Sequence, residues 1–287
     1  MIQFSTDQLK ELWQPKVDSY GEDNGQVTII GGSRLFHGAP ILALRAASRL
    51  ADMVFFASPE PTSGEVAAKI KSKLSSFIWV PWGEVEEYIK KSDAVLIGPG
   101  LMRFKREDSR FKIQDLRKSL DEAGTLTRSI TKYLLQKFPE KQWVIDGGSL
   151  QVMEAEWIPK NAILTPNRKE YESLFKFQFS ISNFQTFAQK YKCVIVYKNP
   201  VSYVTDGEMT YEITGGNAGL TKGGTGDVLA GVTAGLAAKN VRMLAAGAAI
   251  WLVKKTADML FEKVGYAYNA DMLAEEIFET YRQFVVD

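Results

Sequence analysis

The feature that most constrains the fold is the alternation of two hydrophobic patterns along almost the whole chain. Short apolar runs rich in β-branched residues are typical of buried strands, and longer runs with apolar residues at every third or fourth position are typical of helices. The predicted strands cover residues 27–30, 54–57, 77–80, 94–97, 143–145, 162–164, 193–197, 202–205 and 210–213. The predicted helices cover residues 40–51, 63–73, 85–90, 127–137, 167–175, 183–191, 227–238, 242–261 and 270–284.

This alternation predicts an α/β fold in which a mostly parallel sheet is covered by helices on both faces. No linker-like run and no internal repeat divides the 287 residues, so we expect a single domain over residues 1–287. The highly charged segment 102–125 has weak periodicity and is predicted to be an exposed insertion. Two interpretations of this segment stay open, a solvated loop and a mobile lid over the site.

A glycine-rich turn that runs directly into an apolar helix is the strongest functional motif. Residues 219–231 read GLTKGGTGDVLAG. Glycines let backbone N–H groups approach an anion, and a helix N-terminus adds unpaired N–H groups and a partial positive charge. Phosphate suits this geometry, whereas the carboxylate of Asp227 would repel it. We therefore expect Asp227 to be a general base that takes the proton of a hydroxyl group attacking the phosphate.

Composition removes several classes of protein. The net charge is +1, which gives no indication of nucleic acid or an anionic membrane as a partner. The chain has one histidine and one cysteine, so zinc hydrolases and Ser-His-Asp enzymes are disfavoured and no metal-binding side chains are predicted. The N-terminus does not resemble a signal peptide, and the apolar run 243–253 is too short to cross a bilayer. The expected location is the cytoplasm.

Six segments in the same order resemble the ribokinase-like superfamily and, within it, the ADP- or ATP-dependent NAD(P)H-hydrate dehydratases. They are GGS at 31–33 with GAP at 38–40, IGPGL at 97–101, VIDGGSL at 144–150, LTPNRKE at 164–170, VYK at 196–198 and the glycine-rich motif at 216–231. The resemblance implies a ribokinase-like three-layer sandwich. It also implies dehydration of hydrated NADH or NADPH, in which the added hydroxyl attacks the terminal phosphate of ADP or ATP and phosphate is then expelled. This is a carbon–oxygen lyase reaction that repairs damaged nicotinamide nucleotides.

The resemblance also implies roles for individual residues. Asp227 would be the catalytic base, and an anion hole would be formed by the N–H groups of Gly224, Thr225 and Gly226. Binding of the hydrate is assigned to Ala39, Gly100, Asn167 and Asp227. Asn167 stands where the family usually has histidine, so it can donate a hydrogen bond but cannot carry a positive charge. Nucleotide binding is assigned to Lys198, Asn199, Ser202 and Gly226.

Lys222 is a further candidate, because it stands three residues after Gly219 and five before Asp227. It either contacts a nucleotide phosphate or is an ordinary surface lysine. The expected cofactor is Mg²⁺ bound to the nucleotide phosphates, with water as most of its other ligands. Relatives form homo-oligomers and some are fused to an epimerase, so a homo-oligomer and a separate epimerase protein are expected partners.

Two other functions stay open. A small-molecule kinase of the same fold would use Asp227 in the same way but leave the phosphate on its product. A nucleotide-binding relative without catalysis would fit the altered motifs, because 146–151 reads DGGSLQ where the family usually has DADALN, and Asn167 replaces the histidine.

Overall fold

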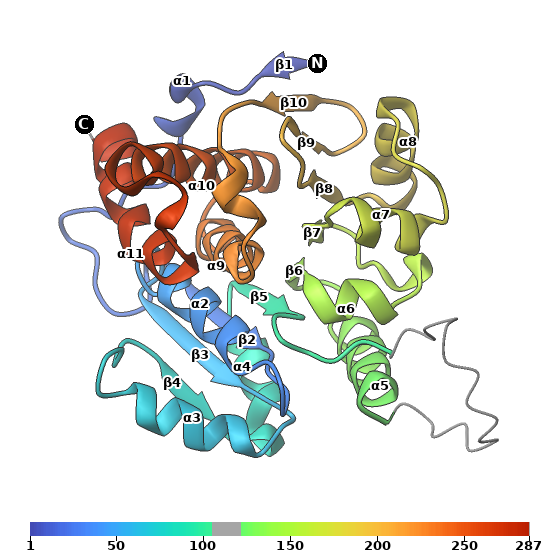
Figure 1. Cartoon of the computed structure of the whole chain (residues 1–287). Helices are drawn as coiled ribbons and strands as arrows, with labels where there is room; N and C mark the ends of the chain where they lie inside the picture. Colours follow the sequence, from blue (N-terminus) through green and yellow to red (C-terminus); the bar gives the residue numbers. More distant parts are fainter. Residues whose placement is uncertain (105–121, 287) are drawn as a thin grey trace.

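A mixed sheet forms the centre of the molecule (Figure 1). The computed structural model describes residues 1–104 and 122–286. Within this part of the chain the strand order is β1-β10-β9-β8-β7-β6-β5-β2-β3-β4. All neighbours are parallel except β9, which runs antiparallel to both β8 and β10. The strands are β1 (Ile2–Gln3), β2 (Gln26–Ile30), β3 (Met53–Ala57), β4 (Ile78–Val80), β5 (Ala94–Ile97), β6 (Gln142–Ile145), β7 (Ile163–Leu164), β8 (Val194–Tyr197), β9 (Ser202–Thr205) and β10 (Thr210–Ile213).

Helices cover both faces of this sheet, as Figure 1 shows for α9, α10 and α11 on one side of β5–β8 and α5 to α8 on the other. The first group is α2 (Gly38–Ala47), α3 (Thr62–Ile70), α9 (Thr225–Ala237), α10 (Arg242–Val264) and α11 (Ala270–Tyr281). The second group is α4 (Val85–Lys91), α5 (Glu122–Lys137), α6 (Gly147–Val152), α7 (Arg168–Phe175) and α8 (Ile181–Tyr191). The short α1 (Thr6–Leu9), the 3₁₀ helices η1 (Trp82–Glu84), η2 (Ala155–Trp157), η3 (Ala218–Thr221) and η4 (Gly265–Ala267), and the π-helical turn η5 (Arg282–Val286) complete the described elements.

The central strands are mostly apolar because both of their faces are buried. In β2, Ile29 packs into the core under α2 and α9, and its neighbour Ile30 packs into the core under α4 and α5. Leu96 and Ile97 of β5 divide in the same way. The period of two in a strand therefore places neighbouring apolar residues in two separate cores.

The glycines of α9 allow it to lie very close to α2. A Cβ atom at Gly231 would lie 2.3 Å from the carbonyl oxygen of Ala43, a distance that no side chain tolerates. The small residues of this helix therefore allow its backbone to approach that of α2 closely. The contact fixes the position of the N-terminus of α9.

Each of the nine predicted strands and nine predicted helices has a counterpart in the structure, with shifts at the ends. The sequence did not predict β1, α1 or α6, which are two, four and six residues long and too short for a hydrophobic period to be recognised. Helix α5 begins at Glu122, so residues 122–125 of the expected insertion are helical, and residues 105–121 lie outside the described residues. Of the described helices, none has the length and apolar character needed to cross a membrane.

The chain order of the strands reverses between β2 and β5, which are neighbours in the sheet. From β2 the chain moves outward through β3 and β4, then returns to β5 and moves the other way through β6, β7 and β8. Open α/β sheets bind their ligands beyond the carboxyl ends of the strands at such a point. Loops 31–33 and 98–100 follow β2 and β5 there, and Asp146 and Lys198 follow β6 and β8.

Candidate active site

The turn before α9 is held in shape by its own residues. Gly224 is the N-cap residue with φ of +95°, a left-handed conformation that favours glycine. The hydroxyl of Thr225 lies 2.7 Å from the carbonyl oxygen of Leu220 and 2.9 Å from that of Lys222, so its single O–H donor is shared between them. The backbone N–H of Thr225 also lies 3.4 Å from the oxygen of Lys222. The helix N-terminus is thus tied to the loop that precedes it.

Asp227 lies in the first turn of α9, and burial raises the pKa of its carboxyl group to about 7. The negative charges of Asp146 and Glu170 raise the pKa further, and the ammonium group of Lys198 opposes them. A carboxyl group with this pKa exchanges its proton near neutral pH, which suits a general base.

The ammonium group of Lys198 interacts with three carboxylates of the described residues, those of Asp146, Glu170 and Asp227. Its Nζ lies 2.7 Å from Oδ1 of Asp146 and 3.8 Å from Oε2 of Glu170. A Cβ at Gly226 would lie 3.4 Å from the same Nζ, which places the ammonium group against the glycine-rich turn. Burial lowers the pKa of Lys198, but Asp146, Glu170 and Asp227 more than reverse this effect, so the lysine stays charged.

The other two carboxylates are held by hydrogen bonds. Thr165 Oγ1 donates to Oδ1 of Asp146 at 2.7 Å. Asn167 is the N-cap of α7, where its side chain accepts from the N–H of Glu170 at 3.1 Å and Glu170 Oε2 accepts from the N–H of Asn167 at 2.9 Å. This reciprocal capping box places Glu170 beside Lys198. Burial raises the pKa of Glu170, and the charge of Lys198 lowers it.

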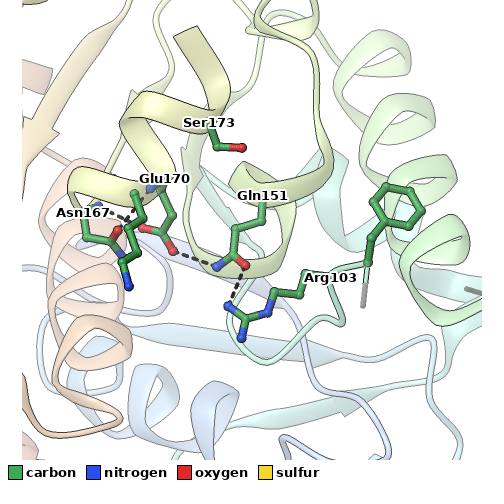
Figure 2. Close-up of a pocket in the computed structure, with 7 residues that line it drawn as sticks. Arg103, Gln151, Asn167, Glu170 and Ser173 are labelled. Carbon is green, nitrogen blue, oxygen red and sulfur yellow. Dashed lines mark hydrogen bonds between the residues drawn. The ribbon is translucent and has the colours of Figure 1, made fainter. Parts of the chain in front are cut away.

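Figure 2 shows the polar wall that continues outward from this group. Oε1 of Glu170 accepts from the Gln151 amide at 2.9 Å, and Oε1 of Gln151 accepts from Arg103 at 3.1 Å. These residues line a cavity of about 280 Å³ together with Asn167 and Ser173. The hydrogen-bonded row therefore joins a surface arginine to the buried ion pair of Lys198 and Asp146.

A second cavity, of about 600 Å³, lies beside the N-terminus of α9. All the residues to which the sequence assigns nucleotide binding line it: Lys198, Asn199, Ser202, Lys222 and Gly226. Asn167 lines both cavities. One wall is apolar and is formed by Leu229, Ile250 and Val253. The cavity thus offers an apolar surface beside a helix N-terminus, which suits a ligand with a flat ring and an anionic group.

Lys222 has partners that the sequence did not indicate. Its ammonium group donates to the carbonyl oxygens of Tyr266 and Tyr268, between α10 and α11. It also lines the larger cavity, so the contact with a nucleotide phosphate remains a prediction.

Ala39 and Gly100 lie together on the other side of the turn. A Cβ at Gly100 would lie 3.2 Å from Cβ of Ala39, which belongs to α2. A Cβ at Gly224 would lie 2.5 Å from Leu42 of the same helix, so α2 contacts both the loop of Gly100 and the glycine-rich turn. Neither residue belongs to the described lining of the two cavities. Their contact with the hydrate remains a prediction.

Asp146, Thr165 and Glu170 were not predicted as site residues, although they surround the candidate base. Asp146 and Thr165 directly follow β6 and β7, and the sequence Asn-x-x-Glu at 167–170 is the pattern of a capping box. These two features were the available evidence in the sequence. Gly148 replaces the second acid of the usual motif, and a Cβ there would lie 2.1 Å from the carbonyl oxygen of Leu101, so this backbone has no room for that acid.

Within residues 1–104 and 122–286, no group of three or more acidic, histidine or cysteine side chains is arranged to hold a metal ion. Carboxylate oxygens are the ligands that Mg²⁺ prefers, but those of Asp146 and Glu170 are already bonded to Lys198, Thr165, Gln151 and the backbone. These residues fit Mg²⁺ that arrives with the nucleotide phosphates and keeps its waters, better than a resident ion.

Comparison with known proteins agrees with this geometry. The family model described as NAD(P)H-hydrate dehydratase matches residues 27–279. The bifunctional NAD(P)H-hydrate repair enzyme of Archaeoglobus fulgidus is 31% identical over 271 residues, which is 91% of this chain and 52% of that protein. The ADP-dependent (S)-NAD(P)H-hydrate dehydratase of Cenarchaeum symbiosum is 29% identical over 255 residues, 81% of this chain and 79% of that protein. The chain spans about half the length of the bifunctional relatives.

Solved structures agree in fold. A ribokinase-like superfamily protein from Enterococcus faecalis superposes with a TM-score of 0.82 at 24% identity, covering 100% of this chain and 97% of the other. The ADP/ATP-dependent NAD(P)H-hydrate dehydratase from Bacillus subtilis, crystallised with ATP and Mg²⁺, has a TM-score of 0.77 at 19% identity and covers 99% and 98%. The ribokinase-like sandwich expected from the sequence is confirmed. With the family model matching nearly the whole sheet and the helices around Asp227, the chain belongs to the NAD(P)H-hydrate dehydratase family.

Proposed function

We propose that this protein removes water from hydrated NADH or NADPH and consumes ADP or ATP in doing so. The observation that carries the proposal is the half-buried Asp227, with a pKa of about 7, at the N-terminus of α9 beside the 600 Å³ cavity. The names of the relatives supply the reaction, and this site supplies a base and a place for the nucleotide.

Asp227 takes the proton of the ring hydroxyl as its oxygen attacks the terminal phosphorus of the nucleotide. The new O–P bond forms as the bond from phosphorus to the bridging oxygen breaks. The phosphorylated ring then loses phosphate from one carbon and a proton from the next, which restores the double bond. Because its pKa is near neutral, Asp227 is ionised in a large fraction of molecules before each reaction and can release the proton afterwards.

The negative charge that builds on the transferred group would be stabilised by the turn 224–226 and by the dipole of α9. Lys198 lies against the same turn and is positively charged. Mg²⁺ bound to the nucleotide would neutralise part of the phosphate charge. These are the sequence-based assignments of the anion hole, the nucleotide residues and the cofactor, which the cavity and the cluster support.

The test is an activity matrix in which purified protein is incubated with ADP or ATP and with prepared NADH hydrate or NADPH hydrate. We expect the absorbance of the reduced nicotinamide to return and one phosphate to be released per molecule repaired. A stable phosphorylated product would instead indicate the small-molecule kinase. Nucleotide binding without turnover would indicate the non-catalytic relative.

Asp227→Asn tests the base directly. The variant keeps the size of the side chain and loses the proton acceptor, so turnover should fall by about two to four orders of magnitude while the affinity for nucleotide stays within a few-fold. Steady-state kinetics and calorimetric titration measure the two quantities. Asp18→Asn, at an exposed acid, is the matched control. Undiminished turnover in Asp227→Asn would show that another group removes the proton.

The expectations of a homo-oligomer, a separate epimerase and a cytoplasmic location remain predictions. The relatives named bifunctional repair enzymes are about twice the length of this chain. Light scattering of the purified protein would establish its number of subunits.

A further inference from the structure

A buried lysine in α10, Lys254, donates hydrogen bonds to the backbone that lines the larger cavity. Lys254 is 3% exposed, and its side chain lines this cavity. Its ammonium group donates to the carbonyl oxygens of Asn199 at 3.2 Å, Gly215 at 2.9 Å and Pro200. An ammonium group has three N–H donors, so these three acceptors use its whole capacity. Lys254 therefore has no donor left for a phosphate group.

Asp258 lies one turn further along the same helix. Its carboxylate accepts hydrogen bonds, whereas Lys254 donates them. Its Oδ2 accepts from the N–H of Gly216 at 2.9 Å, and its Oδ1 accepts from the side-chain amide of Asn217 at 3.2 Å. The hydroxyl of Tyr268 donates to the other end of that amide at 2.8 Å. Lys254 bonds carbonyl oxygens and Asp258 bonds N–H groups. Together they hold two loops, 198–201 and 214–217, against helix α10.

Both loops supply the lining of the cavity. Asn199 and Pro200 line it from the connection between β8 and β9, and Gly215, Gly216 and Asn217 line it from the connection between β10 and η3. Lys254 joins the two connections, because its ammonium group donates to the carbonyl oxygen of Asn199 in one and to that of Gly215 in the other. A change at Lys254 would therefore alter the width of the cavity between them.

Burying an ammonium group is unfavourable, and Lys254 offsets this cost with hydrogen bonds to three carbonyl oxygens that would otherwise lose a partner. Its partners are three carbonyl oxygens of the cavity lining, so its charge acts on the shape of the binding site. We propose that Lys254 is a positioning residue whose charged ammonium group sets the affinity of this cavity for adenine nucleotides. The inference rests on the proposed function only in naming the nucleotide.

The pH dependence follows from the environment of the lysine. Burial lowers its pKa to about 8, and Asp258 on the same helix raises it. At the start of the first loop Lys198 has a raised pKa, as does the phenol of Tyr268 behind the second loop, so both keep their protons near pH 8. The other loop residues that it contacts, Asn199, Pro200 and Gly215, carry no charge. Raising the pH through about 8 should remove the proton and one donor of Lys254, and ligand affinity should fall.

The experiment compares Lys254→Met with Lys255→Met, which removes the same charge from the neighbouring, partly exposed position whose ammonium group lies near the ring of Phe284. Dissociation constants of ADP and of uncharged adenosine are measured by calorimetry at pH 7. We expect Lys254→Met to weaken both ligands about tenfold, because the loss of a charged, hydrogen-bonded group alters the cavity itself. The control should match the unsubstituted protein. Weakened ADP with unchanged adenosine would overturn the inference, since the charge would then act on the phosphates from a distance.

Two further measurements need no stable variant at position 254. In the unsubstituted protein the dissociation constant of adenosine, which does not titrate in this range, should rise between pH 7 and pH 9.5. The protection of peptides containing residues 199–202 and 214–217 against deuterium exchange, taken relative to the intrinsic base-catalysed rate at each pH, should fall over the same range. Constant affinity and constant protection would both contradict the role of Lys254. If protection falls but neither ADP nor adenosine binds at any pH, the contact of Lys254 with the loops stands and both the nucleotide assignment and the proposed function fail.

Discussion

Asp227 shows how a single residue can suit the proposed reaction and be unfavourable for the fold. Its folded-state pKa of about 7 lies above the ordinary value of 3.8. A raised pKa means that the folded protein binds the proton more tightly than the unfolded chain does. The contribution of Asp227 to stability is therefore fully present below about pH 4 and is lost as the pH rises toward 7.

Asp227→Asn should therefore be more stable than the unsubstituted protein at pH 8, by about 3 kcal/mol, and the difference should shrink as the pH falls to 5. The asparagine needs no ionisation and avoids the repulsion of Asp146 and Glu170. Denaturant unfolding at several pH values measures the difference. A variant that is less stable at pH 8 would contradict the raised pKa.

Asn167 combines two roles that a pair of substitutions can separate. The side-chain oxygen of Asn167 caps α7, and Asn167 also lines both cavities. Asn167→Ala should lose about 1 kcal/mol of stability, whereas Asn167→Ser keeps a capping oxygen and should lose little. Both variants lack the amide N–H group, so both should raise the KM for the hydrate. If Asn167→Ser binds the hydrate normally, the amide is not a substrate contact.

At the scale of elements, the contact between α2 and α9 decides where the glycine-rich turn lies. Gly231→Ala places a methyl group 2.3 Å from the carbonyl oxygen of Ala43, so the two helices must separate. We expect a loss of about 1–3 kcal/mol of stability despite the better helix propensity of alanine. Gly83→Ala is the control, because no atom lies within 4 Å of the added methyl group. Equal denaturation midpoints would show that the helices tolerate the methyl group.

At the scale of the whole molecule, the larger cavity lies between the N-terminus of α9, helix α10 and the loops after β8 and β10. A ligand that contacts all of these elements can bind only the folded protein, so it stabilises the folded state over the unfolded chain. ADP at about 100 times its dissociation constant should raise the free energy of unfolding by about 2.7 kcal/mol. Differential scanning calorimetry should then show a higher Tm, while the same concentration of inorganic phosphate should have a smaller effect. An unchanged Tm with ADP would argue against the nucleotide site.

The strands, the helices and the glycine-rich turn could be predicted from the sequence because their determinants are local. A hydrophobic period of two or of 3.6 residues, a turn glycine and a helix start can each be recognised from a few neighbouring residues. The family motifs are local in the same sense, which is why Asp227 and the lining residues Lys198 and Gly226 were identified in advance.

Only the tertiary structure decided what surrounds Asp227. Asp146, Glu170 and Lys198 follow three different strands, and their charges meet Asp227 because the carboxyl ends of those strands share one edge of the sheet. A pKa depends on burial and on distances of a few ångströms between residues remote in sequence, which no local pattern encodes. For the same reason Lys254 looked like any helical lysine, and its three carbonyl partners emerged only when α10 and the two loops were brought together.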